Sequence, residues 1–284
     1  MMELWDFISH PFTYAFMQRA ILAALATGFV CALLSCFLVL KGWSLMGDAI
    51  SHAVLPGIVL AYLAGIPIII GAFASGLCCS VATGYIKENC RVKEDTVMGI
   101  VFSGMFAFGL VLFSKVDTSQ HLNHILFGNV LGTTYAELGQ ILTIAIIVSI
   151  LVIIKRRDLM LFCFDPVQAK VIGLPVKILH YGLLSVLALT IVASLQAVGV
   201  ILVIAMLIAP GITAFLLCKR FELMLIIAII VSVFSTVTGT LISFYIDGAT
   251  GACIVILQAT IFILAQCYRL IVNHVKQSNR FNPA

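Results

Sequence analysis

A carboxylate and an imidazole lie four residues apart in a part of the chain that carries little other charge. Asp48 and His52 belong to the stretch KGWSLMGDAISHAVLPG, residues 41–57. On a helix, residues four apart stack on one face, and this pair suits a divalent first-row metal ion. Ionisable groups at membrane depth are costly and mark functional sites. The spacing therefore predicts that Asp48 and His52 contact a metal ion, with a purely structural pair as the alternative.

Glycine and proline flank this pair and predict an interrupted helix. Gly47 precedes the pair, and Pro56 and Gly57 follow it. Broken helices are tolerated in membranes where they line a cavity or pack against protein. Pro210 and Gly211 are expected to break or kink a later helix in the same way. These two Pro-Gly steps are the candidate hinges.

Three further residues are weaker candidates for metal contact. His121 and His124 are three residues apart in the segment KVDTSQHLNHILFGNVLGTTYAE, and they could share an ion on one turn of helix. A solvated loop face is the favoured alternative for both. Asp247 lies in the run FYIDGATG, where a turn-capping role is the favoured alternative.

The composition is that of a membrane protein. Of 284 residues, 62% are hydrophobic and 10% are charged, with a mean hydropathy of +1.19, whereas soluble domains carry about 25% charged residues. The apolar runs are continuous and roughly 17–24 residues long, as transmembrane helices require. We predict an all-α polytopic membrane protein with about nine spans and one domain, 1–284. An eight-span alternative merges the second and third runs. The expected spans are 19–40, 48–65, 67–86, 97–114, 138–154, 180–197, 199–217, 222–245 and 251–271.

The basic residues predict an orientation. With nine spans, all of the 16 lysines and arginines except Arg19 and Lys115 fall on one side. Basic loops are cytoplasmic, so the N-terminus is expected outside and the C-terminus inside the cytoplasmic (inner) membrane. The net charge of +4 is spread over these short loops, and we expect no nucleic-acid partner.

The longest loop on the basic side, KRRDLMLFCFDPVQAKVIGLPVK, residues 155–177, predicts a short capped helix. Asp165 can cap its start, with Pro166 in the first helical position. Gly173 can end it after about two turns, near Ile172. A rigid element in a cytoplasmic loop is suited to docking another protein. The candidate docking residues are Asp165, Pro166, Gln168, Lys170, Gly173 and Pro175.

Enzyme signatures are absent from the sequence. It contains no GxxxxGK[ST] phosphate-binding loop and no HExxH metalloprotease motif. We therefore predict a transport subunit and not an enzyme. If transport uses ATP, a separate chain must hydrolyse it.

Four runs, in order along nearly the whole chain, carry a family resemblance. They are SLMGDAISHAVLPGIVLAYLAG, EDTVMGIVFSGMFAFGLVLFS, FDPVQAKVIGLPV and QAVGVILVIAMLIAPGITAFLL. Together they resemble the membrane permeases of bacterial metal-ion ABC importers, the manganese, zinc and iron uptake family. The similarity is greatest to the manganese and iron(II) permeases.

This resemblance implies a fold similar to that of the cobalamin and siderophore importers, which have one more N-terminal helix. It also implies a second permease copy or paralogue, a cytoplasmic ATPase dimer and an extracytoplasmic metal-binding protein. In the family, the Asp and His of the GDAISH run are associated with metal, and they fall on Asp48 and His52. The ATPase-docking loop falls on residues 165–175.

The expected cargo is Mn2+ or Fe2+ carried as substrate, with no permanently bound cofactor. Two alternatives remain: a zinc importer permease, and a proton-coupled secondary metal transporter. The capped helix in the 155–177 loop favours an ABC importer over the secondary transporter, because a secondary transporter has no ATPase to dock.

Overall fold

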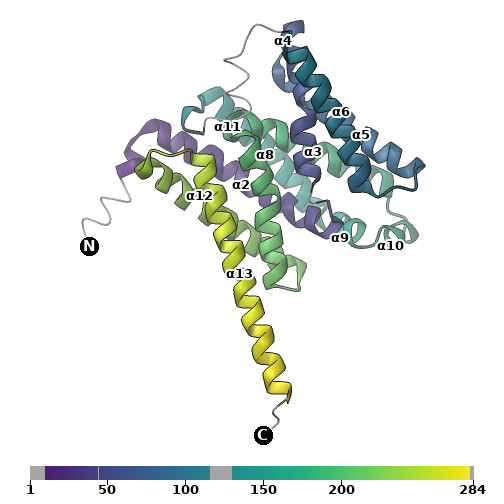
Figure 1. Ribbon diagram of the computed structural model, residues 1–284, viewed down its shortest axis with the longest axis vertical. Coiled ribbons are helices and arrows are strands. Elements are labelled where there is room, and N and C mark those ends of the chain that lie inside the picture. Colours follow the sequence, from purple (N-terminus) through teal and green to yellow (C-terminus); the bar gives the residue numbers. More distant parts are fainter. Residues whose placement is uncertain (1–9, 44, 116–129, 282–284) are drawn as a thin grey trace.

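The computed structural model describes residues 10–43, 45–115 and 130–281, and every regular element in those residues is helical (Figure 1). Two are short 3-10 helices, η1 and η2, and the others are α-helices. The elements are η1 His10–Thr13, α2 Ala15–Lys41, α3 Met46–Ala53, α4 Leu55–Ala64, α5 Ile68–Asn89, α6 Glu94–Phe113, η2 Val130–Gly132, α8 Tyr135–Ile154, α9 Arg156–Phe164, α10 Pro166–Val171, α11 Val176–Leu217, α12 Phe221–Ile246 and α13 Thr250–Phe281.

Within the described residues, nine helical spans are long and apolar enough to cross a membrane. This number confirms the nine-span prediction over the eight-span alternative. The second span runs through α3 and α4, and the third is α5. They are separate because Gly65 ends α4 in a left-handed conformation, with φ 68°, and the non-helical residue Pro67 directly precedes α5.

Helix α11 contains two spans, Val176–Leu195 and Val198–Leu217, joined without a loop. The bend is at Gly199, whose φ of 79° and ψ of 166° are open only to glycine at low cost. The helix continues through Pro210, so the span is not broken at that residue, and a kink or hinge at Pro210–Gly211 stays a prediction. Ser35 of α2 contacts this point instead: its hydroxyl oxygen accepts from Gly211 N at 2.9 Å.

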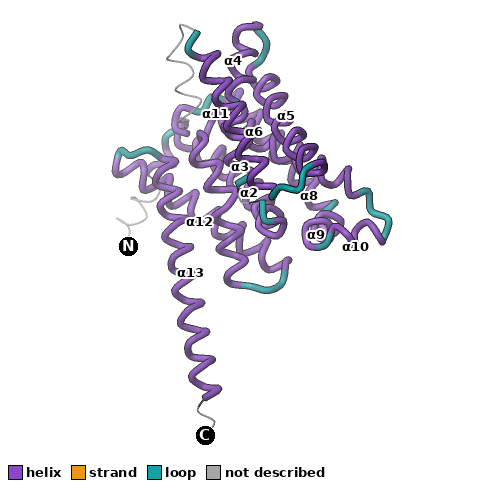
Figure 2. Tube along the Cα trace, turned by 45° about the vertical axis from the view of Figure 1, so that its right-hand side comes forward, coloured by secondary structure: helices purple, strands orange, loops and turns teal. Residues whose placement is uncertain are grey.

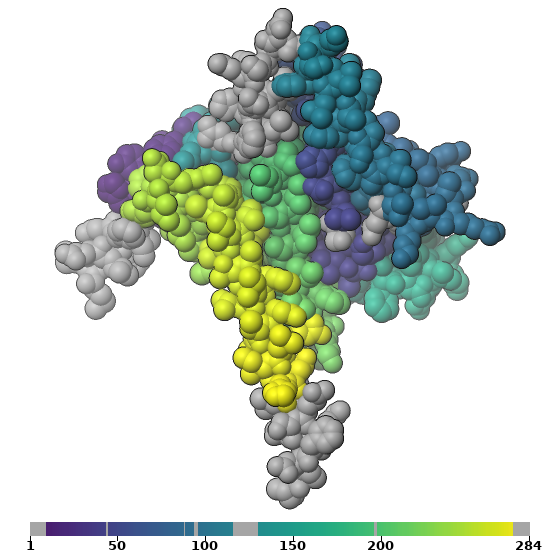
Figure 3. Space-filling view, in the orientation of Figure 1, coloured from purple at the N-terminus to yellow at the C-terminus, as the bar shows by residue number. Residues whose placement is uncertain are grey.

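Helix α2 lies at the centre of the bundle and is the most buried of the spans. It packs against α11, α12 and α8. Helices α6 and α13 are the least buried spans. Figure 2 shows α13 extending beyond the rest of the bundle, and Figure 3 shows α6 and α13 covering much of one face. These apolar outer faces are available to lipid or to another subunit.

Candidate metal site where α3 meets α6

The two residues of the candidate metal site lie on one face of α3. The His52 Nε2 and Asp48 Oδ1 atoms are 3.3 Å apart. Their side chains are about one third exposed, 34% for His52 and 36% for Asp48, although four of the other six residues of α3 are at most 2% exposed. The pair is therefore accessible from one side of the helix, as contact with a passing ion requires.

Helix α6 positions the imidazole with two aromatic rings. The Phe106 ring lies edge-on to His52 with centroids 5.2 Å apart, and the Phe102 ring is stacked at 6.3 Å. Both phenylalanines come from the run FSGMF, where their i, i+4 spacing places them on one helix face. They could not be assigned to the site from the sequence, because an aromatic pair in an apolar span is usually packing and does not reveal its partner.

The helical hydrogen bonding of the second span is interrupted directly after the pair, as predicted, although Val54 keeps helical backbone angles. Helix α3 ends at Ala53, and α4 begins at Leu55 with Pro56 in its first turn. Pro56 has no N–H, so it cannot donate to the carbonyl of His52, four residues earlier. The His52 backbone carbonyl therefore lacks its helical hydrogen-bond donor from Pro56.

Glycines let three helices pack tightly around this break. A Cβ at Gly57 of α4 would overlap the Gly71 carbonyl of α5. A Cβ at Gly109 of α6 would lie 2.9 Å from both Pro56 Cδ and Pro56 N. These glycines support a packing role at Pro56–Gly57, and the proposed hinge would have to move within this tight contact.

Gly109→Ala is expected to lower the stability of the permease by disturbing the packing of α6 against Pro56. Gly104→Ala on the same helix is not expected to lower it. Overpacking costs about 1–3 kcal/mol, and the added methyl at Gly109 would press on Pro56. At Gly104 a Cβ meets nothing within 4 Å, and alanine favours helix by up to about 1 kcal/mol. Thermal unfolding of the two detergent-purified variants measures the difference. Equal melting temperatures would contradict the tight packing at Pro56.

The pair is an incomplete coordination shell. Within residues 10–43, 45–115 and 130–281, no group of three or more His, Cys, Asp or Glu side chains is placed to hold a metal ion. Ser51 directs its hydroxyl to the Gly47 carbonyl, 2.7 Å away. Weak, multi-site contact suits an ion that must leave again, so two protein ligands fit a transport path better than a storage site.

The other predicted metal candidates do not join this pair in the described part of the chain. Asp247 ends α12 in a left-handed conformation with φ 54°, and the Gly248 N–H donates to the Ser243 carbonyl. This geometry agrees with the turn-capping alternative. His121 and His124 lie outside the described residues.

The predicted short helix in the 155–177 loop is present as α10. The Asp165 carboxylate accepts from Val167 N at 2.9 Å and from Gln168 N at 3.0 Å, and Pro166 begins the helix. It ends at Val171, one residue before the predicted end. Gly173 has the expected left-handed φ, 90°. The sequence therefore predicted both the start and the stop of α10.

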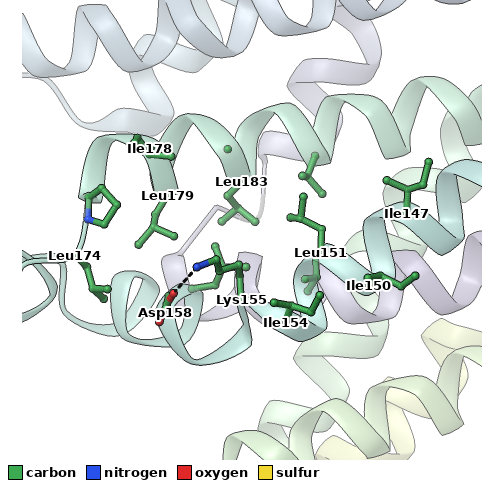
Figure 4. Close-up of a pocket in the computed structure, with 15 residues that line it drawn as sticks. Ile147, Ile150, Leu151, Ile154, Lys155, Asp158, Leu174, Ile178, Leu179 and Leu183 are labelled. Atoms are coloured by element: carbon green, nitrogen blue, oxygen red, sulfur yellow. Dashed lines mark hydrogen bonds and ion pairs between the residues drawn. The ribbon is translucent and has the colours of Figure 1, made fainter.

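A second helix, α9, precedes α10 and was not predicted, because its sequence opens with charged residues. Lys155, just before it, pairs with Asp158 at 3.3 Å, and Arg156 pairs with Glu222 of α12 at 3.6 Å. Figure 4 shows the first pair beside an apolar groove of about 720 Å³ between α8 and the start of α11. The loop thus contains two helices in contact with each other, and an exposed ion pair links the first of them to α12.

Within the described residues, nine candidate membrane spans and a partly exposed Asp-His pair are the features of a multi-pass membrane protein. The chain belongs to the ABC 3 transport family, whose model matches residues 13–269. It is 71% identical over 273 residues to the chelated iron transport system membrane protein YfeD of Yersinia pestis, covering 96% of this chain and 91% of the relative.

Further comparisons agree in sequence or in fold. The chain is 52% identical over 261 residues to the manganese transport system membrane protein MntB of Synechocystis, covering 92% of this chain and 85% of the relative. Its fold matches PsaBC from Streptococcus pneumoniae with a TM-score of 0.83 and 36% identity, covering 92% and 95% of the two chains. A putative metal-chelate type ABC transporter shares the fold, with a TM-score of 0.69 at 17% identity.

Proposed function

We propose that this chain is the permease through which an ABC importer moves Mn2+ or Fe2+ across the bacterial inner membrane. The observation that carries the proposal is the Asp48–His52 pair, 3.3 Å apart and one third exposed at a broken span. Carboxylate and imidazole together suit both ions. Relatives named for manganese and for iron transport support this choice of cargo over zinc.

Under the same proposal, the ion's remaining ligands are not side chains of the described residues of this chain. A second permease copy or paralogue, placed with its own pair across a shared path, would supply two more ligands. Water and backbone carbonyls near Pro56 would supply the rest. The metal is transported cargo, and no cofactor stays bound.

Two partner proteins complete the importer. A cytoplasmic ATPase dimer would receive α10, because the chain has no phosphate-binding loop of its own. An extracytoplasmic metal-binding protein would deliver the ion at the opposite face. The basic residues support this orientation, with the N-terminus outside and residues 155–177 in the cytoplasm.

Uptake in a bacterial strain that lacks its own manganese and iron importers tests the function. The chain, expressed with its ATPase and its binding protein, is expected to restore accumulation of radioactive Mn2+ or Fe2+. An ATPase variant that cannot hydrolyse ATP should abolish this accumulation. Accumulation that persists with the inactive ATPase and collapses with a protonophore would instead indicate proton-coupled transport. Preferential accumulation of Zn2+ would favour the zinc alternative.

A further inference from the structure

A second cavity lies at the end of the bundle that carries α9 and α10. It is lined by apolar side chains and by three basic side chains. Its volume is about 430 Å³, and α9, the turn between α11 and α12, and α13 enclose it. Figure 1 shows that turn beside α13. The lining residues are Leu40, Met160, Leu161, Phe164, Phe215, Cys218, Lys219, Arg220, Phe221, Met224 and Arg269.

The charge of this cavity is not balanced by nearby carboxylates. Lys219, Arg220 and Arg269 all line it, and none has an acidic partner among the described residues. The closest acid in sequence, Glu222, pairs with Arg156 instead. The larger groove between α8 and α11 differs, because its only charged lining residues are Lys155 and Asp158, which pair with each other.

The cavity lies at the level where the bilayer meets the cytoplasm. Arg269 is 19 residues after Thr250, the first residue of α13, and a helix of that length rises about 28 Å. This nearly equals the roughly 30 Å hydrocarbon thickness. Phe215 is 49% exposed near the end of its span, and Phe164 is 79% exposed just before α10. Apolar surface and cations therefore meet where a lipid has its acyl chains and its headgroup.

We propose that this cavity binds one anionic phospholipid of the cytoplasmic leaflet. Basic pockets between transmembrane helices on the cytoplasmic side recognise acidic headgroups. The phosphodiester would lie against Lys219, Arg220 and Arg269, and an acyl chain against Phe215 and its apolar neighbours. The lipid would bridge α9, α12 and α13, next to the helix that docks the ATPase. The proposal uses the proposed orientation but does not depend on which metal is carried.

Native mass spectrometry of the complete transporter, released from nanodiscs of phosphatidylglycerol and phosphatidylcholine, tests this site. The variant Lys219→Gln/Arg269→Gln is expected to retain phosphatidylglycerol about 10- to 30-fold less than the unmodified protein, because each cation contributes roughly a fivefold factor at an anionic surface. Arg91→Gln/Lys93→Gln, on another loop of the same side, loses equal charge and should retain the lipid normally.

Three results would overturn the proposal. Unchanged phosphatidylglycerol retention by Lys219→Gln/Arg269→Gln is the first. Displacement of the lipid by excess inorganic phosphate is the second, because it would reveal a site for free phosphate. Loss of ATPase binding with unchanged lipid retention is the third, because the cavity would then be a protein contact. Melting temperatures within about a degree of the unmodified protein show that both variants fold.

Discussion

Asp48→Ala and His52→Ala are each expected to abolish metal uptake while leaving the permease inserted and assembled. Losing even an outer-shell partner of a metal ligand costs about 10- to 100-fold, so losing one of two direct ligands should lower uptake by at least about 100-fold. Both side chains are partly exposed, so their truncation leaves no large buried cavity. Radioactive Mn2+ or Fe2+ uptake, normalised to permease in the membrane, measures the loss.

Two control variants remove a carboxylate and an imidazole at positions away from the Asp48–His52 pair. Asp158→Ala breaks an ion pair of the same length, 3.3 Å, on α9, and His10→Ala removes an exposed imidazole before α2. Both variants should retain uptake close to that of the unmodified protein. If Asp48→Ala and His52→Ala transport at near-normal rates, the pair has only a structural role.

Gly173→Val is expected to uncouple the permease from its ATPase. Gly173 has φ 90° and directly follows Ile172, the C-cap residue of α10. A β-branched residue cannot adopt that conformation without strain of about 1–2 kcal/mol or more, and a helix as short as α10 is not stable alone. We expect weaker ATPase binding, or ATP hydrolysis without uptake. Co-purification and parallel hydrolysis and uptake assays measure both.

Two glycine variants separate backbone strain from added bulk. Gly173→Asn should restore most of the coupling, because asparagine tolerates left-handed φ. Gly182→Val places the same side chain in α11, where a Cβ meets nothing within 4 Å, and should couple normally. Intact assembly and uptake in both Gly173→Val and the charge-reversed Lys170→Glu would show that this loop does not transmit the ATPase motion.

The sequence was sufficient for the features that depend on local chemistry. Continuous apolar runs located nine spans because a bilayer demands a minimum helix length. Asp165 and Gly173 located the ends of α10 because caps are local interactions. Pro56 located the break after His52 because proline has no N–H to donate.

Features that depend on packing between distant segments were not predictable. Gly199 lies in the apolar run VGVILV, and only the folded chain shows that the backbone leaves helical geometry there. The contact of His52 with Phe106 joins helices about fifty residues apart. The close approach of Gly57 to Gly71 likewise depends on how α4 and α5 pack. The packing around Asp48 and His52 was therefore visible only in the structure.

Electron-nuclear double resonance of Mn2+ bound to the complete transporter, held without ATP, tests most directly whether His52 is a metal ligand. We expect a nitrogen coupling from a histidine ligand, which shifts when histidine is labelled with 15N and disappears in His52→Ala. A manganese spectrum with only water and carboxylate ligands, or a histidine coupling that survives His52→Ala, would contradict it.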